Sequence, residues 1–117
     1  MASAHTTVTR AGDAAVVCAS CLVADNPLLR LRGLLGRGEL RSGEGLLLRP
    51  SGSIHTWFMR FAIDALFLDR DLRVVRIAAR IPPWRFALAR KARAVLELPA
   101  GQAARAGLEV GDRLVVA

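Results

Sequence analysis

Residues 63–79 read IDALFLDRDLRVVRIAA and decide the fold. Two short apolar runs, Ile63–Leu68 and Arg73–Ala79, flank Asp69-Arg70-Asp71, and this order predicts two strands joined by a hairpin turn. Similar runs recur along the chain at Ala14–Ala24, Leu46–Leu48, Ile54–Met59, Ala94–Leu98 and Arg113–Val116. The sequence therefore predicts a mainly-β domain, a small sandwich or barrel with one or two short helices, at the margin of the α+β class.

The clearest helical pattern lies between two of these runs. Asn26 can cap a helix, and Pro27 suits its first turn because the missing N–H would be unpaired there. Leucines at positions 28, 31, 34 and 35 recur at helical spacing, and glycines at 36 and 38 end the pattern. We expect a helix over Pro27–Leu35.

The length of 117 residues fits one domain. Residues 1–13 are small and polar, which predicts a flexible arm, and residues 14–117 form the compact unit. No apolar run is long enough to span a membrane. Two cysteines in all favour a reducing cytoplasm over a disulfide-stabilised exterior.

The net charge of +7 favours anionic partners, such as a small anionic ligand, although a protein partner is equally compatible with the sequence. The arginines are scattered over the chain, as on solvated faces, so we do not expect nucleic-acid binding.

Cys18-Ala19-Ser20-Cys21 has the C-x-x-C spacing of redox and zinc sites. On a regular strand, residues three apart point to opposite faces about 10 Å apart, too far for a disulfide. For zinc, only His5 and His55 could add nitrogen ligands. We interpret both cysteines as small, half-buried strand residues, and we expect no metal and no cofactor, although a redox or metal role is not settled by sequence.

The segment from Ser53 to Asp64 carries most of the candidate functional side chains. If Ile54–Met59 is a strand, His55, Trp57 and Met59 share one face. Asp64 alternates with Leu66 and Leu68, so its carboxylate needs hydrogen bonds from backbone amides or an arginine. A ligand pocket would then be bordered by Arg32, Arg37, His55, Trp57, Met59, Arg60 and Asp64.

Three functions are compatible with these residues. The first is a non-enzymatic binding or accessory module that uses this polar and aromatic pocket, because no nucleophile–base pair and hence no catalytic residue can be identified. The second is a small hydrolase or isomerase with Asp64 and His55 as acid and base. The third is peripheral attachment to an anionic surface through Trp84–Arg93, expected to be a loop or short helix.

The order of several motifs resembles the family called domain of unknown function 192. The motifs run RLRGLLGR at 30–37, GLLL at 45–48, His55–Asp69, VLELPAG at 95–101 and Gly111-Asp112. The resemblance implies a small β-sandwich or barrel with one or two short helices, and it supplies no catalytic residue because the family's role is not established. Met59, Asp64 and Phe67 match the pattern, whereas Ala62 replaces its usual proline and the preceding link is shorter.

Overall fold

The computed structural model describes residues 5–25 and 38–117, and strands dominate this part of the chain. The elements are β1 (His5–Arg10), β2 (Val16–Ala24), β3 (Glu44–Leu48), β4 (Ser53–His55), β5 (Ile63–Leu68), β6 (Val74–Ile81), β7 (Phe86–Leu88), β8 (Ala94–Pro99), α2 (Gln102–Arg105) and β9 (Leu114–Val116). The mainly-β prediction is confirmed. The predicted hairpin is confirmed as well, because β5 and β6 pair antiparallel across the Asp69–Asp71 turn.

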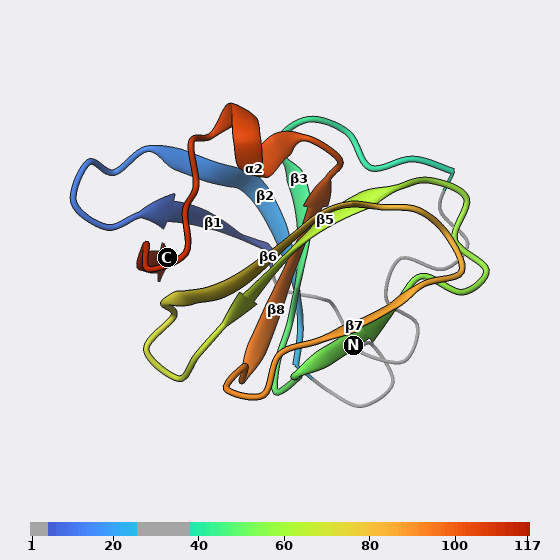
Figure 1. Ribbon diagram of the computed structural model, residues 1–117. Helices are drawn as coiled ribbons and strands as arrows, with labels where there is room; N and C mark the ends of the chain where they lie inside the picture. Colours follow the sequence, from blue (N-terminus) through green and yellow to red (C-terminus); the bar gives the residue numbers. More distant parts are fainter. Residues whose placement is uncertain (1–4, 26–37) are drawn as a thin grey trace.

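Seven strands form one mixed sheet in the order β6-β5-β8-β3-β2-β1-β9 (Figure 1). Strands β2 and β3 are parallel, and the other neighbours are antiparallel. The two edges of the sheet meet, because Arg73 and Arg113 form an antiparallel bridge and Val74 N donates to Asp112 O at 2.7 Å. The sheet thus curls into a small barrel whose two edge strands meet near Arg73 and Arg113.

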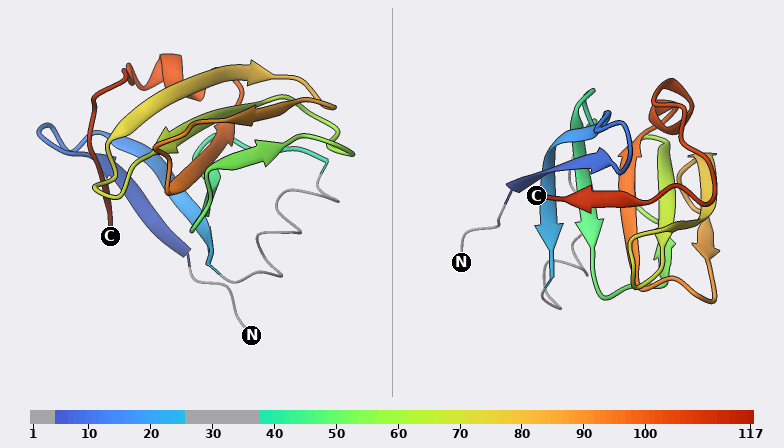
Figure 2. Two further views of the ribbon diagram at one scale, coloured as in Figure 1. Left: turned by 60° about the horizontal axis from the view of Figure 1, so that its bottom comes forward. Right: turned by 90° about the vertical axis from the view of Figure 1, so that its left-hand side faces the viewer.

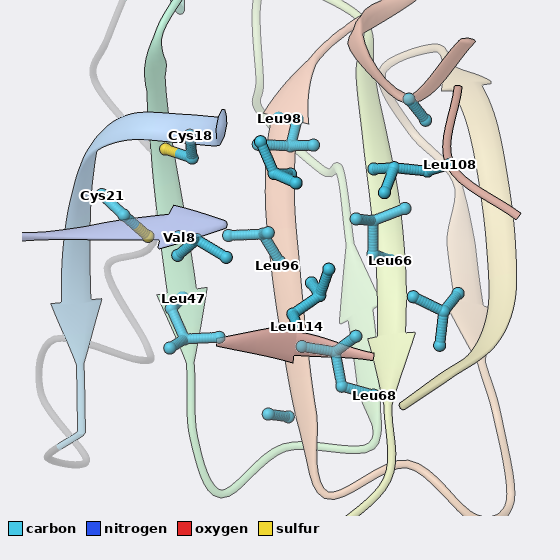
Figure 3. Packing of buried hydrophobic residues seen from close by; sticks show 14 residues of the cluster. Val8, Cys18, Cys21, Leu47, Leu66, Leu68, Leu96, Leu98, Leu108 and Leu114 are labelled. Carbon is cyan, nitrogen blue, oxygen red and sulfur yellow. The ribbon is translucent and has the colours of Figure 1, made fainter. Parts of the chain in front are cut away.

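The barrel interior is one apolar cluster to which every strand of the sheet contributes (Figure 3). Leu47, Leu66, Leu96 and Leu114 are among its fully buried side chains. Ala103 of α2 belongs to the same cluster, so the short helix covers one end of the barrel.

A second cluster lies on the outer face of the sheet. Strands β4 and β7 form a separate two-stranded antiparallel ribbon (Figure 2). In this ribbon His55 lies opposite Phe86. Ile54 and Ala87 of the ribbon are buried against Ile63 and Phe67 of the sheet. The outward side of the ribbon, which carries His55, Phe86 and Leu88, is exposed.

The predicted N-terminal arm is too long. Residues 5–10 form β1, which pairs with β2 on one side and with β9 on the other. Five of its six residues are polar and Val8 alone enters the core, so the segment lacks the apolar alternation that would reveal a strand in the sequence. The predicted helix Pro27–Leu35, with Arg32 and also Arg37, lies outside the described residues.

The predicted strand Ile54–Met59 is wrong beyond His55. The chain turns at Thr56, and Phe58 adopts the left-handed backbone region with φ 65°. His55 and Trp57 are therefore exposed while Met59 is buried. The segment 84–93, expected to be a loop or short helix, contains strand β7.

The prediction that Cys18 and Cys21 face opposite ways is also wrong. Thr6 pairs with Cys21 and Val8 with Cys18, so two residues of β2 oppose Thr7 alone, which is a β-bulge. Both thiols consequently enter the barrel interior, fully buried and free (Figure 3). The hydrogen bond between them lowers the pKa of Cys18 and, together with burial, raises the pKa of Cys21.

Candidate binding surface

Asp64 is a structural anchor at the end of the barrel. Its Oδ1 accepts hydrogen bonds from the backbone N–H groups of Arg80 at 2.8 Å and Gly101 at 3.1 Å, and its Oδ2 accepts from Ala103 at 2.9 Å. The side chain is fully buried. One carboxylate thus ties β6 and the start of α2 to β5, as its place on an apolar face requires.

This arrangement separates Asp64 from the other predicted site residues. Asp64 shares the inward face of β5 with Leu66 and Leu68, whereas Met59 belongs to the outer cluster and His55 is exposed on the ribbon. The structure brings His55 and Trp57 together, with ring centroids 4.9 Å apart. It does not bring Asp64 to them, so these side chains form neither the predicted shared pocket nor an acid–base pair.

Thr56 holds the two loops beside the ribbon together. It is fully buried, and its Oγ1 donates to Pro82 O at 2.7 Å and accepts from Arg85 N at 2.8 Å. Its backbone N–H donates to Arg85 O at 2.8 Å, and its carbonyl accepts from Trp84 N at 3.0 Å. These bonds fix the segment 82–85 against the turn at 56–59.

The loops 56–59 and 82–85, together with the ribbon, present an exposed and mainly apolar surface, here called the aromatic face. It consists of His55, Trp57 (47% exposed), Phe58 (69%), Trp84 (58%), Phe86 (58%) and Leu88 (47%). Phe58 and Trp84 meet edge to face with centroids 4.7 Å apart. Because His55 lies opposite Phe86 and stacks near Trp57, the rings adjoin one another across both strands and both loops. Adjoining exposed side chains of this size are typical of interaction sites.

Two residues of the aromatic face have strained backbones. Phe58 has φ 65° and Trp84 has φ 68°, a region that bulky side chains rarely adopt. Such strain persists only where the surroundings enforce it, and it clusters at functional sites. Here the bonds of Thr56 enforce it, and the result is that both rings lie exposed on the surface.

The surroundings of the aromatic face are positively charged. The chain has no Asp or Glu from 45 to 63 or from 72 to 96, the two stretches that build the ribbon and its loops. Within them, Arg60 and Arg85 are exposed beside the aromatic residues, and Arg90, Lys91 and Arg93 are exposed in the turn after β7. The surface therefore combines apolar rings with uncompensated positive charge.

Glu97 is a buried acidic residue in the middle of the sheet. It lies in one row across the outer face with Leu46 of β3 on one side and Ala65 of β5 on the other. Its side chain is 3% exposed, and no hydrogen bond to it is found within the described part of the chain. Burial raises the pKa of Glu97 to about 8. The carboxyl group is therefore largely protonated at neutral pH.

The depression found in the surface and the titratable clusters give no sign of a ligand among the described residues. A shallow depression of about 510 Å³ is lined by Gly38, Glu39, Arg41 and Glu44, and Arg41 pairs with Glu39 at its exposed rim. No group of three or more His, Cys, Asp or Glu that could hold a metal occurs within residues 5–25 and 38–117. In the same ranges no helix is long and apolar enough to cross a membrane.

The family model of domain of unknown function 192 (DUF192), described as an uncharacterised conserved family, matches residues 6–116. The chain belongs to the DUF192 family. The resemblance inferred from the ordered motifs is confirmed, and the family carries no established function.

Relatives of this DUF192 chain include a UPF0127 protein of Pyrococcus furiosus, 38% identical over 95 residues that cover 78% of the chain and 81% of the relative. A UPF0127 protein of Pyrococcus abyssi is 33% identical over 99 residues, covering 79% and 81%.

Two solved structures share the fold of this DUF192 chain. A protein of unknown function from Novosphingobium aromaticivorans is 28% identical, with TM-score 0.82 over 97% of the chain and 84% of that protein. A proposed transcription regulator of Sinorhizobium meliloti has TM-score 0.87 over 99% and 96%. At 23% identity, the second likeness shows the fold alone.

Sequence reasoning missed three residues that stand out in the structure of this DUF192 chain, two of them at the aromatic face and its loops and one in the sheet. Thr56 gives no signal, because its role depends on loops 26 residues away in sequence. The predicted strand Ile54–Met59 would place Phe58 on the face opposite His55 and Trp57, but the strand ends at His55 and Phe58 lies in the following turn. Glu97 did carry a signal, since a lone charge inside the apolar run Val95–Leu98 has to be buried or break the strand.

Proposed function

We propose that this protein is a non-enzymatic binding module that attaches to anionic phospholipid membranes, from the cytoplasmic side, through the aromatic face. The observation that carries the proposal is the pair Phe58 and Trp84, two exposed aromatic rings in enforced left-handed conformations, carried by stretches of sequence that contain no acidic residue. The charge of those surroundings favours an anionic occupant, as the third sequence hypothesis expected.

The chemistry of the surface fits a lipid headgroup region. Tryptophan and phenylalanine are the side chains that anchor peripheral proteins in the interfacial zone, where the rings are buried and polar edges stay hydrated. Basic residues beside an anionic leaflet contribute about 1 kcal/mol each. Arg60 and Arg85 are placed to make this contribution beside the inserting rings.

Flotation of the protein with vesicles tests the proposal. We expect binding to phosphatidylcholine vesicles that contain phosphatidylserine, weak binding to phosphatidylcholine alone, and loss of binding at high salt because screening removes the charge attraction. Phe58→Asn and Trp84→Asn should each weaken binding about tenfold or more, because burial of such a side chain is worth about 1.5–3 kcal/mol.

Asparagine is chosen because it tolerates positive φ better than other side chains, so both variants should fold. Val110→Asn is the matched control, since Val110 is an equally exposed apolar residue far along the chain in the turn before β9. Equal flotation of the Trp84→Asn and Val110→Asn proteins would overturn the proposal. If the protein binds single-stranded oligonucleotides but not vesicles, the membrane proposal is wrong and the aromatic face binds nucleic acid.

A further inference from the structure

Two arginine side chains converge over Gly101, at the opposite end of β8 from the turn at 90–93. A β-carbon added at Gly101 would lie 2.9 Å from Arg105 Nη1 and 3.2 Å from Arg80 Nη2. These distances limit the separation of the two nitrogens to about 6 Å, where like charges repel each other measurably. Something must therefore hold the two guanidinium groups together.

The backbone and one side chain position this pair. Asp64 accepts the N–H groups of Arg80 and Gly101, which brings the end of β6 beside the start of α2. Gln102 Oε1 accepts from Arg105 Nε at 3.3 Å and from Nη2 at 3.2 Å, which leaves Nη1 directed toward Arg80. Arg80 itself has φ 53°, so its backbone is held in a strained conformation by the bond to Asp64.

No carboxylate neutralises the two charges within the described part of the chain. Asp64 is bonded to both backbone segments, but its oxygens accept three backbone N–H groups, and neither arginine forms a salt bridge with a described residue. A side chain at Gly101, whose φ is 88°, would collide with both guanidinium groups, because they occupy the space that its β-carbon would need. The two exposed arginine side chains are therefore close enough for one anion to contact both.

We propose that Arg80 and Arg105 form a binding site for the phosphate group of a small molecule or lipid. A tetrahedral oxyanion can accept N–H bonds from both guanidinium groups at once, and arginine is the side chain best suited to such recognition. Binding would also offset the repulsion between the arginines. This site is independent of the aromatic face, because none of its residues belongs to that surface.

Titration with inorganic phosphate at constant ionic strength, followed by amide NMR, tests the site. We expect saturable shifts at Gly101 and Arg80, and at least tenfold weaker binding in Arg80→Gln and in Arg105→Gln. Arg70→Gln removes the same charge from the exposed β5–β6 turn and should leave the affinity unchanged. Glutamine keeps the backbone N–H of residue 80, so the anchor at Asp64 is retained.

Two further experiments distinguish a soluble phosphate compound from a lipid headgroup as the ligand. Competition by glycerol phosphate indicates a soluble ligand. If Arg80→Gln loses binding to vesicles that contain phosphatidic acid but still binds vesicles that contain phosphatidylserine, the ligand is a lipid headgroup. Equal phosphate affinity in Arg80→Gln, Arg105→Gln and Arg70→Gln, or no saturable shift at Gly101, would overturn the site while leaving the membrane proposal standing.

Discussion

Glu97→Gln should make the protein more stable at neutral and alkaline pH. The pKa of Glu97 is 4.5 without burial and about 8 in the folded chain, because the carboxylate would lose its hydration on the outer face of the sheet. The unfolded state therefore releases this proton at lower pH than the folded state. Stability contributed by the neutral carboxyl group is full below pH 4.5 and is lost as the pH rises toward 8.

The size of the effect follows from the two pKa values. At 1.36 kcal/mol per pH unit, the loss of stability is on the order of 3 kcal/mol at pH 7 and on the order of 5 kcal/mol above pH 8. Glutamine has nearly the same shape and never ionises. Glu97→Gln should therefore remove the loss, while differing little from the wild type near pH 4.5.

Urea denaturation across this pH range measures the effect, since urea is uncharged and leaves the titration unperturbed. Glu109→Gln is the control, because Glu109 is an exposed glutamate in the loop after α2. Parallel pH profiles of unfolding free energy for the wild type and Glu97→Gln would refute the reasoning, and would mean that Glu97 is ionised and paired in the folded protein.

Three other substitutions or treatments test the supporting structure. Asp64→Asn should lower the free energy of unfolding by about 1.5–3 kcal/mol, measured by urea denaturation at neutral pH, because charge-assisted bonds to backbone amides are lost; unchanged stability would show that Asp64 is not an anchor. Thr56→Val should destabilise by about 1–3 kcal/mol and weaken vesicle flotation, because Arg85 N and Pro82 O lose their hydroxyl partner; full flotation would show that the loops hold their shape without it. Cys18 and Cys21 should resist a thiol reagent in the native protein and react on unfolding, since both are fully buried; rapid native labelling would contradict the bulged strand.

The barrel was predictable where local pattern and tertiary structure agree. The hairpin of β5 and β6 follows from two apolar runs around an acidic turn, and the alternation Asp64, Leu66, Leu68 correctly placed the carboxylate on a buried face. The need of Asp64 for hydrogen bonds from backbone amides follows from the cost of desolvating a carboxylate. The identity of those amides could not be predicted, because Gly101 and Ala103 are brought to Asp64 only when the whole sheet has formed.

The binding surface was not predictable for a related reason. Ile54–Met59 alternates like a strand, yet the chain leaves the strand at Thr56, whose partners Pro82 and Arg85 are remote in sequence. A bulge at Ala19 and Ser20 likewise reversed the expected face of Cys21 without any signal in composition. Period-two reasoning fails at one inserted residue, since every later side chain changes face.

Native tryptophan fluorescence during vesicle titration tests the central claim most directly. Both tryptophans of the chain, Trp57 and Trp84, lie on the aromatic face and are exposed, so the emission reports on that surface alone. Phosphatidylserine-containing vesicles should shift the emission to shorter wavelength, and lipids brominated on the acyl chain should quench it, with phosphatidylcholine vesicles giving little change. Emission that stays unshifted and unquenched at saturating anionic lipid would contradict membrane attachment through the aromatic face.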